Sequence, residues 1–93
     1  MKIKHTDDGK KGAFQAYDAN DTFAGDMTYT WAGDQRFIAD HTGVEDAFAG
    51  QGVGMHLFEA LVAFAREKGV KVIPLCPYVK SRFDKLENYR DVL

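Results

Sequence analysis

The hydrophobic pattern of the chain changes its period once, near residue 50, and this change limits the possible folds more than any other feature. Before it, bulky and small polar residues alternate over 22–31 and more briefly over 14–17, which predicts β-strands. After it, apolar residues recur every three or four positions over 53–68, which predicts an amphipathic helix. The change from strands to a strong helix indicates an α/β layer fold.

Shorter signals predict the remaining elements. Turn residues at 18–21 and at 32–34 separate the strands into hairpins, and Gly69 ends the main helix. Four more elements are expected: strands over 2–5, 36–42 and 70–75, and a short helix from Pro77 to about residue 86. We therefore expect an α/β (α+β) fold in which the main helix packs on a mixed, mostly antiparallel sheet.

Composition limits the class of protein. A chain of 93 residues has room for one domain, residues 1–93, and its hydrophobic fraction of 45% can fill one core. The formal net charge of -2 argues against a nucleic-acid partner, and no apolar stretch is long enough to cross a membrane. Because Cys76 is the only cysteine and no secretory signal is visible, we expect a cytoplasmic location.

The stretch Ala49-Gly50-Gln51-Gly52-Val53-Gly54 joins the strands to the main helix. Glycines at alternate positions permit positive φ, so several backbone N–H groups can point into one space at the positive end of the helix. That geometry suits a phosphate or pyrophosphate, although an ordinary tight turn has the same composition. The preceding hairpins disfavour a Rossmann fingerprint, and the absence of Gly-Lys-Ser/Thr excludes a Walker A loop.

Gly50-Gln51-Gly52-Val53-Gly54 followed by an amphipathic helix resembles the acyl-CoA binding motif of the GNAT superfamily of N-acetyltransferases, in particular its short single-domain members. Three further segments resemble that family: His41-Thr42-Gly43-Val44, Lys71-Val72-Ile73-Pro74-Leu75-Cys76-Pro77-Tyr78 and Glu87-Asn88-Tyr89. The resemblance covers nearly the whole chain. It implies a GNAT-like fold and acetyl-CoA as the acyl donor.

The resemblance also implies which residues hold the cofactor. These are the backbone of Gly50, Gln51, Gly52, Val53, Gly54 and Met55 around the pyrophosphate, together with Val44, Pro77 and Tyr78. For Tyr78, packing in the aromatic core is the alternative. A bulky residue at Gly52 or Gly54 should then abolish CoA binding while the fold survives. Two departures from the superfamily concern the acceptor more than the donor: Ala49 stands where the wider superfamily has Arg or Gln, and the usual C-terminal strand-helix-strand looks truncated.

Cys76 and His41 are the candidate catalytic residues. Cys76 follows a strand and precedes a helix, where a thiolate could attack the acetyl thioester, but a packed cysteine is the alternative. His41 could act as a base toward an amine or toward Cys76, and the alternative is a structural histidine bonded to a backbone carbonyl. Asp40, adjacent in sequence, is expected on the opposite strand face. No metal-ligand spacing is present, so we predict no metal.

These observations favour a small GNAT-like acetyltransferase that acts on an unidentified small-molecule or peptide amine, directly or through Cys76. The alternative is a non-catalytic acyl-CoA binding module, and a third interpretation is an interaction domain. The sequence does not identify the acceptor, because a near-neutral chain provides no strong steering field. We expect a monomer or a weak homodimer, without a nucleic-acid or membrane partner.

Overall fold

The computed structural model describes residues 1–93 as one five-stranded sheet with helices packed on it. The strands lie in the sheet in sequence order: β1 (Lys2–Asp7), β2 (Lys11–Tyr17), β3 (Phe23–Trp31), β4 (Arg36–Val44) and β5 (Lys71–Pro74). The first four strands are antiparallel neighbours, and β5 runs parallel to β4. The mixed, mostly antiparallel sheet expected from the sequence is therefore confirmed.

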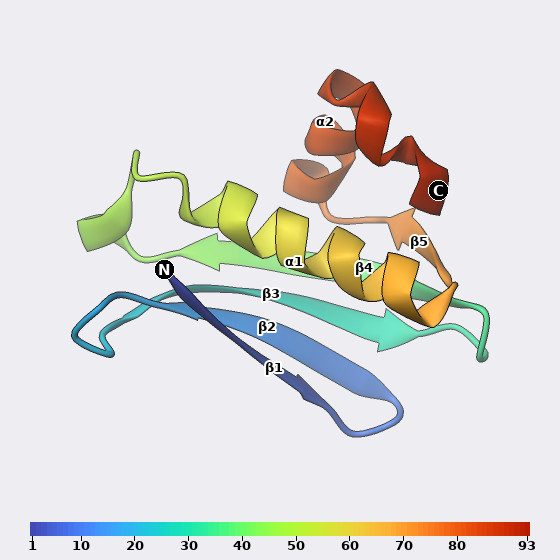
Figure 1. The fold of residues 1–93 in the computed structure, drawn as a ribbon, viewed down its shortest axis with the longest axis horizontal. Coiled ribbons are helices and arrows are strands. Elements are labelled where there is room, and N and C mark those ends of the chain that lie inside the picture. The colour runs from blue at the N-terminus through green and yellow to red at the C-terminus, as the bar shows by residue number, and fades with distance from the viewer.

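The helical segments follow β4 and β5. They are the 3-10 turn η1 (Asp46–Phe48), α1 (Val53–Lys68), α2 (Pro77–Lys85) and the 3-10 segment η2 (Glu87–Val92). Figure 1 shows α1 lying along the sheet and α2 beside β5. Phe58 of α1 and Phe83 of α2 meet with ring centroids 4.9 Å apart, so both helices cover the same face of the sheet. No helix is long and apolar enough to span a lipid bilayer.

The core lies between α1 and the sheet, where the two hydrophobic periods of the sequence meet. Alternate residues of β3, including Met27 and Tyr29, are fully buried against the helix, and so are Leu57, Leu61 and Ala65 on the apolar stripe of α1. The buried set contains no charged residue. No helix packs on the opposite face of the sheet, where Asp26, Thr28 and Thr30 of β3 are half-buried.

Strand β4 separates from β5 halfway along its length. Their parallel pairing ends where Ala39 lies opposite Pro74, although β4 continues to Val44. At the far end of β4, the Glu45 N–H donates to the Ala24 carbonyl, 2.8 Å away. Because the backbone groups of an antiparallel strand alternate in direction, the N–H of Val44 points away from β3, into the opening between β4 and β5.

A β-bulge lies at the point where β4 separates. Thr28 lies opposite His41, but the next residue of β3, Tyr29, lies opposite Ala39. Asp40 is therefore an extra residue in β4. The bulge changes which side chains of β4 share a face, and the positions of the predicted site residues depend on it.

Candidate functional site

The glycine turn before α1 adopts the conformation that its composition permits. Gly50 and Gly52 both have φ of 78°, in the left-handed region where a side chain is strained. Apart from the glycine and its chain neighbours, no atom lies within 4 Å of the position that a Cβ would occupy on either residue. Gly52 is the N-cap of α1, so this open space lies directly in front of the helix N-terminus.

The first N–H groups of α1 have no acceptor within the chain. The hydrogen-bond ladder of the helix begins with the His56 N–H, which donates to the Gly52 carbonyl at 3.1 Å. The N–H groups of Val53, Gly54 and Met55 precede it, and the N-cap glycine has no side chain to accept from them. No acidic residue lies in the first turn to neutralise the positive end of the helix. The arrangement is that of an anion-binding site.

Two further glycines lie close to this helix N-terminus. A Cβ on Gly25 of β3 would lie 2.5 Å from the Gly43 carbonyl oxygen of β4 and 3.2 Å from the Val53 side chain, so the observed approach of β3 to β4 beneath Val53 requires glycine. A Cβ on Gly54 would lie 2.7 Å from Cζ of Tyr78. A bulky residue at Gly54 would therefore disturb the packing of α1 on α2. Substitution of Gly52 and of Gly54 was expected to leave the fold intact, but only Gly52 is free of such contacts.

Tyr78 and Arg82 place an aromatic ring and a positive charge beside the turn. Tyr78 lies one residue after Pro77, which begins α2, and burial raises the pKa of its hydroxyl although the charge of Arg82 opposes the shift. The Arg82 guanidinium lies over the Tyr78 ring, 5.4 Å from its centroid. Its Nε is buried and has no hydrogen-bond partner. Arg82 could not be predicted from the sequence, because a single arginine in a short helix carries no pattern that indicates a binding role.

The open edge of β4 supplies a second set of free backbone groups. Val44 is 40% exposed, and its N–H points into the opening between β4 and β5. Thr42, two residues earlier, has the same backbone direction and also has no strand beside it. The predicted cofactor residue Val44 therefore lies on an edge that can donate hydrogen bonds to a ligand.

Cys76 lies on the helix-covered side of this opening. It is the N-cap of α2 and is only 3% exposed. Its N–H donates to the Ala39 carbonyl at 2.8 Å, and its Sγ lies 3.3 Å from Thr42 Oγ1. Its place at the end of β5 and the start of α2 is the place that the sequence predicted, and the thiol packs against the inner face of β4.

His41 lies on the other face of the sheet. It pairs with Thr28, whereas the next residue, Thr42, faces Cys76. The His41 ring makes no hydrogen bond within the chain, so the structure does not support the alternative of a histidine bonded to a backbone carbonyl. Because of the bulge, Asp40 lies on the same face as His41, where it accepts a hydrogen bond from the Thr30 hydroxyl at 2.7 Å. The expectation that Asp40 points to the opposite face was wrong.

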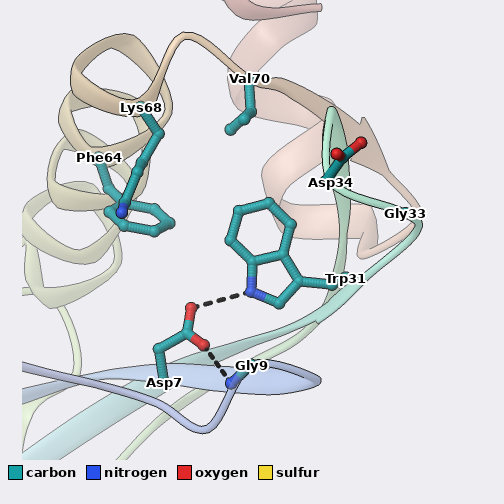
Figure 2. Close-up of a pocket in the computed structure, with 8 residues that line it drawn as sticks. All are labelled: Asp7, Gly9, Trp31, Gly33, Asp34, Phe64, Lys68 and Val70. Atoms are coloured by element: carbon teal, nitrogen blue, oxygen red, sulfur yellow. Dashed lines mark hydrogen bonds between the residues drawn. The ribbon is translucent and has the colours of Figure 1, made fainter.

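The largest cavity of the molecule lies elsewhere, at the C-terminal end of α1. It has a volume of about 580 Å³ and no residue of the glycine turn. Figure 2 shows its lining: Asp7, Gly9, Trp31, Gly33, Asp34, Phe64, Lys68 and Val70. Asp7 accepts hydrogen bonds from Tyr29 Oη at 2.5 Å, Gly9 N at 2.7 Å and Trp31 Nε1 at 2.9 Å.

These contacts explain the charge state of Asp7. Burial alone would raise the pKa of this carboxyl, but the hydrogen bonds from Tyr29, Gly9 and Trp31 lower it below its ordinary value. The Asp7 carboxylate thus links the β1–β2 turn to β3 through these hydrogen bonds. Elsewhere, no group of three or more His, Cys, Asp or Glu residues is close enough together to hold a metal ion.

Comparison with known proteins identifies relatives of the chain. The sequence model of the GCN5-related N-acetyltransferases matches residues 4–92. A search of curated proteins gave no significant match. Among solved structures, a GCN5-like protein from Staphylococcus aureus is similar to this chain with a TM-score of 0.75 and 34% sequence identity, over 98% of this chain and 85% of its own.

Two longer enzymes share the fold. Nourseothricin acetyltransferase has a TM-score of 0.59 and 29% identity, over 71% of this chain and 40% of its own. A ribosomal-protein-alanine N-acetyltransferase from Brucella melitensis biovar Abortus 2308 has a TM-score of 0.69 and 19% identity, over 85% of this chain and 62% of its own. The chain thus spans less than two thirds of either enzyme, and the second likeness concerns the fold alone.

Proposed function

Because the chain belongs to the GCN5-related N-acetyltransferase family, we propose that it binds acetyl-CoA at the N-terminus of α1 and transfers the acetyl group to an amine. The observation that carries this proposal is the set of unpartnered N–H groups at residues 53–55, behind the open space at Gly50 and Gly52. A pyrophosphate offers the anionic acceptors that these groups lack.

The residues around the turn fit such a ligand. Arg82 brings a positive charge next to Tyr78, and its buried Nε lacks an acceptor. Ala49 stands where the wider superfamily has Arg or Gln, and we propose that Arg82 supplies the missing positive charge. Tyr78 and Pro77, at the start of α2, form a wall on which the apolar arm of the cofactor would lie.

The open edge of β4 suits the thioester end of the cofactor. The N–H groups of Thr42 and Val44 point into the opening between β4 and β5 and have no strand to bond. An N–H group held there would donate to the thioester carbonyl oxygen, whose negative charge grows in the transition state. Bound acetyl-CoA supplies an activated acyl group, and the backbone edge would polarise it.

His41 is the base that we assign to the acceptor. Its ring has no hydrogen-bond partner in the chain and is exposed on the helix-free face, so a substrate can reach it. A primary ammonium would lose one proton to the imidazole, and the free amine would then attack the carbonyl carbon. The new C–N bond replaces the C–S bond, and the attacking nitrogen loses its second proton to the departing sulfur, so that CoA leaves as the thiol. His41 releases the first proton to solvent and returns to its neutral form.

We propose that the acetyl group moves directly to the amine rather than through Cys76. Cys76 is 3% exposed, and its thiol is hydrogen-bonded to the Thr42 hydroxyl on the face opposite to His41. His41 therefore cannot take its proton without a rearrangement of β4.

We also propose a cytoplasmic location, because a single free thiol suits a reducing compartment.

A calorimetric titration of the purified protein with acetyl-CoA tests the proposal. We expect micromolar binding at one site per chain, and we expect Gly52→Leu to abolish it. The matched control is Gly33→Leu, because Gly33 also has φ of 78° with open space around it but lies in the β3–β4 turn. Both changes carry a similar backbone strain of about 1–2 kcal/mol.

The possible results separate the two candidate functions. Binding that Gly52→Leu removes and Gly33→Leu preserves supports the cofactor site, and steady turnover with an amine then supports the transferase. Binding without any turnover leaves a non-catalytic acyl-CoA binding module. Absence of binding to a folded sample would overturn the whole proposal.

A further inference from the structure

On the helix-free face of the sheet, Gly43 leaves bare backbone between an imidazole and a carboxylate. The position that a Cβ would occupy on Gly43 lies 3.3 Å from His41 Nε2 and 3.4 Å from Asp26 Oδ1. Apart from Gly43 and its chain neighbours, no other atom lies within 4 Å of that position. The register explains the arrangement, because Asp26 lies directly opposite Gly43 and His41 lies two residues earlier on β4.

Both side chains have unused hydrogen-bonding capacity. Neither the Asp26 carboxylate nor the His41 ring takes part in a hydrogen bond or an ion pair within the chain. Asp26 is partly buried between β2 and β4, where an unpaired carboxylate is less well solvated than at a free surface. The nearest lysine in the same row, Lys4, is separated from Asp26 by Gln15 and forms no ion pair with it.

The location of this patch connects it to the proposed reaction. Gly43 lies between Thr42 and Val44, the two residues whose N–H groups point into the opening between β4 and β5. A group bound over Gly43 on the helix-free face would therefore lie beside the edge to which we assign the thioester carbonyl. The bulge is essential for this, because it brings His41 to the face that Asp26 occupies.

We infer that this patch is the acceptor site and that Asp26 selects acceptors that carry a primary ammonium group, an inference that rests on the proposed function. The carboxylate is the charged partner that an ammonium requires, and a charge-assisted hydrogen bond would orient its nitrogen. His41 lies on the other side of the same space, in position to take the proton. The absent side chain of Gly43 provides the room, and acceptors whose reacting end is anionic or neutral gain nothing from Asp26.

Nuclear magnetic resonance with a small probe tests this assignment. The 15N-labelled protein, saturated with CoA so that no acetyl transfer occurs, is titrated with propylammonium chloride and separately with 1-propanol, which has the same carbon chain without the charge. We expect saturable shifts of the Asp26 and Gly43 amides with propylammonium only. Equal shifts with both probes, or shifts elsewhere, would overturn the assignment.

Two variants test the contribution of the Asp26 charge. Asp26→Asn should weaken propylammonium binding by about tenfold or more, because a charged hydrogen bond is lost. Asp34→Asn, which removes the same charge from the exposed β3–β4 turn, should leave it unchanged. Equal effects of the two variants would show that only net charge matters, and the assignment of Asp26 would fail.

Gly43→Ala tests the space directly. Gly43 has no positive φ, and the new methyl would meet only the ends of two side chains, so the fold should persist. We expect loss of propylammonium binding with acetyl-CoA affinity retained by calorimetry. Retained propylammonium binding would contradict the inference. If the unmodified protein fails to bind acetyl-CoA, the proposed function fails instead, so the two failures are distinguishable.

Discussion

At the scale of single residues, Cys76 shows how burial limits a chemical role. Its position between β5 and α2 is the one that makes a cysteine a candidate nucleophile. The thiol nevertheless packs in the core at 3% exposure, with Thr42 as its hydrogen-bond partner. A nucleophile needs access to the thioester carbon, and this side chain has little.

We expect Cys76→Ala to retain acetyl transfer. The change should lower the free energy of unfolding by about 1 kcal/mol, because it leaves a small cavity in the core. The initial rate with acetyl-CoA and propylamine should stay close to that of the unmodified protein. Mass spectrometry should find no acetyl adduct on the chain. Loss of turnover with unchanged acetyl-CoA binding would instead establish the covalent route through Cys76.

His5 links stability to pH. Its ring stacks on Phe14 at 4.2 Å and meets the edge of Phe64 at 4.4 Å. Burial lowers the pKa of His5 from its ordinary value of 6.5; Asp7 opposes the shift and Lys68 adds to it. The unfolded chain therefore binds a proton at a higher pH than the folded chain does, so stability falls as pH decreases through 6.5.

The thermal unfolding midpoint should accordingly decrease between pH 7.5 and 5.5. His5→Gln should flatten this dependence, because glutamine keeps a donor for Tyr29 but has no titratable ring. His56→Gln serves as the control, because the His56 ring on α1 lacks the aromatic packing that His5 has against Phe14 and Phe64. A slope that His5→Gln leaves unchanged, or that His56→Gln removes, would contradict the assignment.

At the scale of elements, the contact between α1 and α2 depends on the absence of a side chain at Gly54. Tyr78 occupies the space where a Cβ would lie, with Cζ and Oη both 2.7 Å from it. The ring belongs to a wall of the proposed cofactor site. We therefore expect the same glycine to affect both packing and binding.

Gly54→Ala should destabilise the protein by about 1–3 kcal/mol, because the methyl displaces the Tyr78 ring. In a Tyr78→Ala background the same change should cost much less. Chemical denaturation of the two single variants and the double variant measures the difference as a coupling energy. Additive effects would show that the two residues do not contact each other in solution.

The elements also show which features of the fold could be predicted from the sequence. The spacing of apolar residues predicted α1 over 53–68, and the structure has the same bounds. Gly69 ends it with φ of 69°, and the Val70 N–H bonds the Ala65 carbonyl. The bulge at Asp40 could not be predicted from the sequence. One extra residue does not produce a recognisable change in the alternation of a strand, and its position depends on the pairing with β3.

A second class of feature could not be predicted for a related reason. Gly25 gains its role from Gly43 and Val53, which are distant in the chain, and the role of Arg82 depends on the burial of its Nε, which follows only from how α2 packs in the fold. The glycine turn itself was recognisable, because its conformation is local. The catalytic assignments of Cys76 and His41 remain predictions, and the structure adds that they lie on opposite faces of β4.

At the scale of the whole molecule, the sheet separates two surfaces. The helices, the glycine turn and Cys76 occupy one face, and His41 with Asp26 lies on the other (Figure 1 shows the elements that carry them). Near the proposed site, the opening between β4 and β5 joins the two surfaces. This arrangement would let donor and acceptor approach the same backbone edge from opposite sides.

Binding of acetyl-CoA should stabilise the entire fold. A ligand at about one hundred times its Kd adds about 2.7 kcal/mol to the free energy of unfolding. For a chain of this size, that raises the thermal midpoint by roughly 10 °C or more. Differential scanning fluorimetry should show this rise in the unmodified protein and in Gly33→Leu, but not in Gly52→Leu. A rise in all three would place the ligand away from the turn.

The most direct measurement is a 15N chemical-shift titration of the unmodified protein with acetyl-CoA. It locates the ligand without assuming any site. We predict that the largest shifts fall on the amides of Gly52, Val53, Gly54 and Met55, with Val44 on the open edge of β4 also affected. Shifts confined to the cavity around Trp31 and Phe64, or no shifts at all, would contradict the cofactor site at the N-terminus of α1.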